Sequence, residues 1–164
     1  MVKANTRDAR DHLVDEATER VMVASRALVG VAARSLAAVE AEITLRQYRA
    51  LVVMAQAGEQ NISSLAEALE IHPSTATRLC DRLIAKSLIE RTTSRENRRE
   101  VTVTLTTTGQ TLVRSVTTRR RREIRRIVAK LEPNERDALI SALAIFADAA
   151  GEVPDDAWKL GWTG

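Results

Sequence analysis

Apolar residues recur every three or four positions along most of the chain, which is the spacing that gathers side chains on one face of an α-helix. This pattern predicts long helices over 8–39 and from 106–108 to about 130, a shorter helix over 44–55, and a last helix that opens at Pro133. Residues 1–7 lack the pattern and are expected to form a loose polar tail. The chain is therefore expected to be mainly helical.

The stretch 63–105 carries a more compact pattern. Two short helices are predicted on either side of His72-Pro73, because proline suits the first position of a helix, where its missing N–H is not needed. Ser64 and Glu67 have the spacing of a capping box that would start the first of them. Alternating apolar residues and threonines over 101–105 then predict a strand, which pairs with the segment before the preceding loop. Helix, turn, helix and a small β-hairpin wing make a winged helix-turn-helix, which places its second helix in a DNA groove.

The second short helix of this stretch has two chemically distinct faces. Apolar residues repeat on one face at the spacing i, i+3, i+4 and i+7 and are predicted to point inward: Ala76, Leu79, Cys80 and Leu83. Small hydroxyls and arginines occupy the other face, and more arginines lie in the hairpin loop. We predict that these side chains contact DNA: Ser74, Thr75, Thr77, Arg78, Arg82, Arg95, Arg98 and Arg99. The alternative interpretation is a solvated helix with ordinary loop charges.

The order and spacing of these segments resemble the multiple antibiotic resistance regulator (MarR) family of bacterial transcription factors. The resemblance spans roughly residues 10–150. The matching motifs are Leu65-Ala66, Ser74-Thr75-Ala76-Thr77-Arg78, Lys86-Ser87-Leu88, Asn97-Arg98-Arg99 and Leu105-Thr106-Thr107-Thr108-Gly109. Two positions depart from the family pattern, since Ser87 stands where glycine is usual and Asn97 stands where an aspartate is usual.

This resemblance implies a homodimeric, sequence-specific regulator, most often a repressor, that binds pseudo-palindromic operators. It also implies release from DNA by a small aromatic or anionic effector. Tyr48 stands at a position that would line the effector pocket, although its spacing fits a core residue as well. Cys80 is interpreted as a small core residue, not as an oxidant sensor, because it lies on the inward face.

Arg120 is the second candidate ligand-binding residue. It falls near the apolar stripe through Val113 and Val116, so it should be drawn inward. A buried guanidinium needs a carboxylate or another anion. Its partner is either an anionic effector or an internal acid, for which the candidates are Glu16, Glu19, Asp155 and Asp156. The surrounding run of arginines, 119–126, is either a solvated face or an anion-binding surface.

A single domain is expected to hold all 164 residues. Within it, 44–105 would form the DNA-binding lobe, 8–40 and 107–150 the dimerisation helices, and 151–164 a tail. The first helix is apolar on more than one face, which predicts burial against a second subunit. The last helix is expected to turn four apolar residues inward: Leu139, Ile140, Leu143 and Phe146. Two tail residues, Trp158 and Trp162, are expected to dock the tail onto the body or the partner.

The net charge is only +3, but basic residues concentrate between 78 and 126 while both ends of the chain are acidic. That distribution fits a nucleic-acid-binding face. The lone cysteine excludes an intrachain disulfide and is compatible with a reducing cytoplasm.

Other functional classes find little support in the sequence. We see no nucleophile with a matching base, no glycine-rich phosphate loop and no metal-ligand spacing, so no enzyme activity, cofactor or metal is predicted. No stretch approaches the roughly 18–20 apolar residues that cross a bilayer, and the charged N-terminus is unlike a secretory signal, so a cytoplasmic location is expected. The alternative to a regulator is a winged-helix architectural or protein-interaction module without operator specificity.

Overall fold

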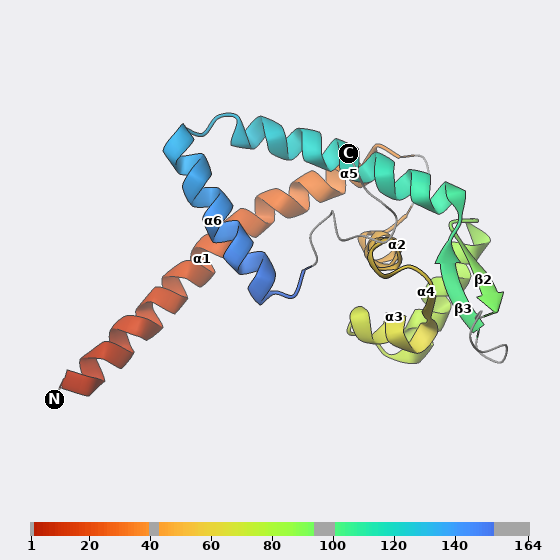
Figure 1. Cartoon of the computed structure of the whole chain (residues 1–164), viewed down its shortest axis with the longest axis horizontal. Helices are drawn as coiled ribbons and strands as arrows, with labels where there is room; N and C mark the ends of the chain where they lie inside the picture. Colours follow the sequence, from red (N-terminus) through yellow and green to blue (C-terminus); the bar gives the residue numbers. More distant parts are fainter. Residues whose placement is uncertain (1, 40–42, 94–100, 153–164) are drawn as a thin grey trace.

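The computed structural model describes residues 2–39, 43–93 and 101–152. A compact lobe, made of α2 to α4 and a small sheet, lies at one end. The long helices α1 and α5 extend from it, and α6 runs back from the far end of α5 (Figure 1). The predicted class, mainly α with a small β-hairpin wing, is confirmed. The elements in chain order are α1 (Val2–Ala37), α2 (Leu45–Ala57), β1 (Gln60–Asn61), α3 (Ile62–Ala68), α4 (Pro73–Ala85), β2 (Ile89–Thr93), β3 (Val101–Leu105), α5 (Thr107–Val128) and α6 (Pro133–Ala149).

Two helices begin earlier than the sequence predicted. α1 begins at Val2, so the prediction of a loose tail over 1–7 is wrong for the described residues. No proline or glycine interrupts that segment, and its alanine, lysine and arginine are good helix formers. α3 begins at Ile62, because the side chain of Asn61 accepts a hydrogen bond from the Ser64 N–H at 2.8 Å. Asparagine is among the strongest N-cap residues, so it starts the helix ahead of the predicted Ser64 cap.

α2 supplies much of the core of the lobe. Thr44 caps it through a reciprocal pair of hydrogen bonds with Gln47, at 3.2 Å and 2.9 Å, and Gly58 ends it with a φ of 79°. Leu51 and Ala55 are fully buried. The predicted helix is therefore present, and its apolar face anchors the elements that surround it.

The sheet contains a third strand that the sequence did not predict. β1 pairs antiparallel with β3, which gives the strand order β1-β3-β2. The hydroxyl of Thr102 on β3 bonds to Glu59, which precedes β1, and lies 2.9 Å from that of Thr92 on β2. These bonds satisfy the hydroxyl of Thr102, which is buried.

The turn after α4 uses a left-handed residue that is not glycine. Ser87 has a φ of 56°. Its N–H donates to the Ile84 carbonyl at 2.8 Å, and the Leu88 N–H donates to the Leu83 carbonyl at 3.0 Å, as in a Schellman motif. The Ser87 carbonyl accepts from the Thr106 hydroxyl at 2.7 Å. This turn therefore joins the end of α4 to the start of α5.

Ser87→Gly is expected to stabilise the protein by about 0.5–1 kcal/mol. A left-handed backbone costs an L-residue roughly 1–2 kcal/mol, and the greater freedom of glycine in the unfolded chain offsets part of that gain. Ser64→Gly, inside α3, is the matched control and should lower stability. Urea denaturation at one protein concentration measures both changes, and a Ser87→Gly variant less stable than wild type would contradict this account.

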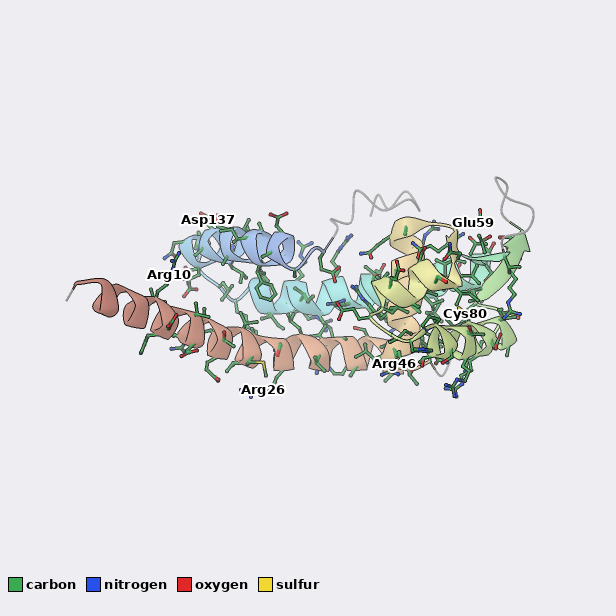
Figure 2. All side chains as sticks on the ribbon, turned by 90° about the horizontal axis from the view of Figure 1, so that it is seen from below. Arg10, Arg26, Arg46, Glu59, Cys80 and Asp137 are labelled. Atoms are coloured by element: carbon green, nitrogen blue, oxygen red, sulfur yellow. The ribbon has the colours of Figure 1, made fainter. Side chains whose placement is uncertain are left out.

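The long helices form a second region. α1 and α5 pack against each other, and α6 is set apart from α1 (Figure 2). After α6, Glu152 pairs with Arg49 of α2 at 2.8 Å, so the chain returns toward the lobe. The tail residues Trp158 and Trp162 lie outside the described residues. Among the helices of the described ranges, none is both long and apolar enough to cross a membrane.

The inner face predicted for α6 is not inward within a single chain. No residue of α6 is buried. Leu139 is half-buried, whereas Ile140, Leu143 and Phe146 are 66%, 50% and 51% exposed. The prediction is wrong for the described part of one chain, because none of the described elements of that chain buries this face.

Candidate nucleic-acid interface

The buried stripe of α4 determines which of its side chains reach the solvent. Ala76, Leu79, Cys80 and Leu83 are at most 6% exposed, as their spacing predicted. On the remaining surface of the helix, Ser74, Arg78 and Arg82 are exposed, and Thr75 and Thr77 are half-buried. The five candidate DNA-contact residues of α4 therefore share the part of the helix that the lobe leaves uncovered.

Local hydrogen bonds order the first turns of α4. His72 is the N-cap, and its Nδ1 accepts from the Ser74 N–H at 3.3 Å and lies 2.9 Å from the Ser74 hydroxyl. The Thr77 hydroxyl donates to the Pro73 carbonyl at 3.0 Å. The sequence placed His72 only between the two short helices, since histidine is not a common capping residue. Because these bonds engage the hydroxyls of Ser74 and Thr77, Thr75 and the arginines are the side chains of this face more available for contact with DNA.

Arg78 is held along the helix by one of its nitrogens. Its Nε donates to the Ser74 carbonyl at 3.3 Å. Among the described residues, its two terminal nitrogens have no hydrogen-bond partner. An arginine fixed at Nε with both terminal nitrogens exposed can donate two parallel hydrogen bonds to a planar acceptor edge.

The wing packs against α4 through its strand β2. β2 and β3 pair from Ile89 opposite Leu105 to Thr93 opposite Val101. The candidate residues Arg95, Arg98 and Arg99 belong to the connection 94–100, outside the described residues. Arg91 on β2 pairs with Asp81 on α4 at 2.5 Å. This pair, which the sequence did not predict, links the wing to the helix, although an exposed ion pair contributes only about 0–1 kcal/mol.

Cys80 lies beneath this surface and not on it. It is fully buried, and burial raises the pKa of its thiol, an effect that Arg91 opposes and Asp81 reinforces. A raised pKa keeps the thiol protonated and unreactive. Its position agrees with the expected small core residue.

A cavity of 710 Å³ lies between the lobe and the long helices. Its walls come from α1, α2, the turn after α3, and α5: Leu28, Val29, Ala32, Leu45, Arg46, Tyr48, Arg49, Leu69, Glu70, Ile71 and Arg120. Tyr48 is 5% exposed, and its hydroxyl lies 3.0 Å from that of Thr117. Tyr48 is therefore both a core residue and part of the cavity wall.

Arg120 reaches this cavity from α5, as its place near the apolar stripe predicted. Its Nε is buried and has no hydrogen-bond partner among the described residues. Of the predicted internal partners, Glu16 instead pairs with Arg20 at 3.6 Å and Glu19 is exposed on α1. Asp155 and Asp156 lie outside the described residues. Within the described part of the chain, the guanidinium therefore lies in the cavity wall without a paired acid.

Residues 43–101 match the model of the MarR family. The chain is 31% identical to the HTH-type transcriptional repressor MdtR of Bacillus subtilis over 108 residues, which are 66% of this chain and 70% of MdtR. It is also similar to the crystal structure of RV1404 from Mycobacterium tuberculosis, with 42% identity, a TM-score of 0.81, and coverage of 87% of this chain and 97% of that one. A mutant of MepR from S. aureus, bound to an oligodeoxyribonucleotide, shares the fold at 23% identity and a TM-score of 0.58, over 81% of this chain and 96% of that one.

Proposed function

The chain belongs to the MarR family of transcriptional regulators, and from this premise we propose that it binds a pseudo-palindromic operator as a homodimer and represses transcription until a small ligand releases it. Membership makes it a regulator of transcription and not an enzyme. By analogy, the repressor MdtR supports repression, and the MepR mutant bound to an oligodeoxyribonucleotide supports DNA binding.

The observation that carries the proposal is the uncovered face of α4. Its first turns combine small hydroxyls with the exposed guanidinium of Arg78, while a buried stripe anchors the helix to the lobe. In helix-turn-helix proteins, the N-terminal residues of the recognition helix contact base edges in the major groove. Small side chains allow the helix backbone to approach the groove, and arginine supplies the paired donors that guanine accepts.

Arg78→Ala is expected to weaken operator binding far more than binding to random DNA. A bidentate contact from arginine to guanine contributes about 1–3 kcal/mol of discrimination between bases. Genome-wide selection of fragments bound by the purified protein first supplies the operator, and titrations on operator and random duplexes at one salt concentration then measure the loss on each.

Arg10→Ala is the matched control, because it removes the same charge at the opposite end of the molecule from Cys80 of α4 (Figure 2). It should leave both affinities nearly unchanged. If Arg78→Ala lowers the affinity for both duplexes equally, Arg78 contacts only the phosphate backbone and no base. Wild-type protein that binds random DNA as tightly as selected fragments would favour the alternative of an architectural module, whose affinity comes nearly all from phosphates.

The homodimer is supported by apolar surface that a single chain leaves uncovered. α1 exposes several large apolar side chains, among them Leu13 at 65%, Val14 at 60% and Met22 at 53%, and α6 exposes the face described above. Contiguous apolar surface of this kind marks protein–protein interfaces. A two-fold dimer also requires operators with two half-sites about one helical turn apart.

The ligand is proposed to occupy the cavity between the lobe and the long helices. Its 710 Å³ lies within the range of about 300–1,000 Å³ that is typical of small-molecule sites. Apolar side chains from α1 and the Tyr48 ring would contact an aromatic body, and Arg120 would pair with an acidic group. A buried donor without a partner costs about 1–3 kcal/mol, so an anion at Arg120 would remove that cost.

Arg120→Ala is expected to retain the fold and operator affinity but to lose ligand-induced release. Release is measured by titrating the operator complex with a panel of small aromatic acids. Without ligand, the melting temperature should stay equal or rise, because the variant removes an unpaired buried donor. Arg125→Ala, exposed on the same helix, is the control. A lower melting temperature without ligand would instead assign Arg120 to an internal acid, and wild-type behaviour in both measurements would exclude any role in the cavity.

A further inference from the structure

A second cavity lies where α1 packs against α5. Its volume is 280 Å³, and it shares no lining residue with the cavity of Tyr48 and Arg120. Its walls combine four arginines with a serine, an alanine and a glutamate: Arg34, Ser35, Ala38, Arg119, Arg122, Glu123 and Arg126. The two helices run alongside each other in Figure 2, so residues distant in sequence meet here.

The positive charge of this cavity exceeds its negative charge. Arg34 donates from Nε at 3.0 Å and from a terminal nitrogen at 2.8 Å to the same carboxylate oxygen of Glu123. Arg119, Arg122 and Arg126 form no hydrogen bond or ion pair with any described residue. Their spacing of i, i+3 and i+7 places the three on one face of α5. Like charges gathered in this way repel one another unless an anion lies between them.

Ser35 points to the same kind of ligand independently of the arginines. It is 1% exposed, and its Oγ has no hydrogen-bond partner among the described residues. Burying a hydroxyl without a partner is unfavourable. A serine inside a helix commonly bonds to a carbonyl four residues earlier, but this hydroxyl forms no such bond, and Ser35 is one of the residues that line the cavity. It is an unused donor at the bottom of a site whose other donors are guanidinium groups.

We propose that this cavity binds a small oxyanion, namely inorganic phosphate or the phosphate group of a small metabolite. The Ser35 hydroxyl would donate to one oxygen, and Arg119, Arg122 and Arg126 would donate to the others, while the bond to Arg34 holds the Glu123 carboxylate. Arginine pairs well with phosphate because its donors match the oxygen geometry. A volume just below the usual small-molecule range suits an anion of this size better than an aromatic effector. The proposal does not rest on DNA binding.

Thermal melts and isothermal titration calorimetry with inorganic phosphate test this site. Phosphate should raise the melting temperature above that in chloride at the same pH and ionic strength, because it binds only the folded state. Ser35→Ala should melt at or above the wild-type temperature without phosphate, yet bind phosphate about tenfold more weakly, as expected for one lost charge-assisted hydrogen bond. Arg122→Gln should show a similar loss. Arg125→Gln removes the same charge from a residue of α5 that does not line the cavity, and it should retain wild-type affinity.

Several outcomes would overturn the site. One is an identical melting temperature for wild-type protein in phosphate and chloride. Another is an equal loss of phosphate affinity in Arg122→Gln and Arg125→Gln, which would show that phosphate responds only to the overall positive charge of the protein. Unchanged affinity in Ser35→Ala would place the anion elsewhere. If Arg122→Gln instead weakens self-association in sedimentation equilibrium and leaves phosphate binding unaffected, the arginines pair with a second copy of the chain.

A glucose 6-phosphate arm distinguishes the two sources of the anion. Tighter binding of glucose 6-phosphate than of inorganic phosphate, with the same loss in Ser35→Ala, would support a phosphorylated metabolite. Tighter binding of inorganic phosphate would support the free ion.

Discussion

Gly109→Ala is expected to destabilise the protein by about 3 kcal/mol or more, although alanine is usually the better helix residue. Gly109 lies in the first turn of α5, against the segment that follows α4. A methyl group there would overlap the Leu88 carbonyl oxygen and would lie 3.0 Å from its carbon and 3.3 Å from Leu105 Cδ2. The carbonyl cannot easily move away, because it accepts the Thr106 N–H at 3.1 Å.

Gly30→Ala is the matched control for this prediction. Gly30 lies in the interior of α1, and its added methyl group would meet only the flexible end of Arg34, at 3.3 Å. That substitution should stabilise the protein by about 0.5–1 kcal/mol. Urea denaturation at equal protein concentration, with the slopes compared, measures both variants. A midpoint for Gly109→Ala at or above that of wild type would show that α5 can shift away from the Leu88 carbonyl.

Phe146→Asp is expected to convert a constitutive dimer into monomers. Phe146 is 51% exposed on the apolar face of α6 that also carries Ile140 and Leu143. If a second subunit covers this face, the substitution buries an unpaired carboxylate, which costs several kcal/mol. A cost of that size raises the dissociation constant by about two or three orders of magnitude. Sedimentation equilibrium at micromolar concentration measures the change.

Ile145→Asp provides the control on the same helix. Ile145 is 72% exposed, and it shares its side of α6 with Ser141 and Asp148 at positions i−4 and i+3. A carboxylate there should remain in water and leave the dimer intact. Wild-type protein that sediments as a stable, folded monomer would refute the dimer itself. Equal dissociation by both variants would show only that α6 tolerates no added charge.

Local signals along the chain were sufficient for most of the helices and for the uncovered face of α4. Thr44 and Pro73 start helices through groups within their own first turn, so neighbouring residues contain the needed information. The inward stripe of α4 follows from helical periodicity alone, and the same periodicity placed Arg120 inward. The start of α3 was missed because Asn61 and Ser64 are both good caps, and the sequence does not rank them.

Other features depended on contacts between distant segments. The two residues of β1 are too few to show alternation, and they form a strand only because β3 pairs with them. The sequence showed Gly109 as part of a family motif, but only the structure shows why a glycine is needed there: a side chain would overlap the nearby Leu88 carbonyl.

The same distinction holds for the cavity between α1 and α5. The sequence shows a run of arginines that helical geometry must spread around α5, and it shows Ser35 far upstream in α1. Packing of the two helices selects Arg119, Arg122 and Arg126 from that run and brings them to Ser35. Spacing within one helix determines which side chains share a face, whereas only tertiary packing determines what that face meets.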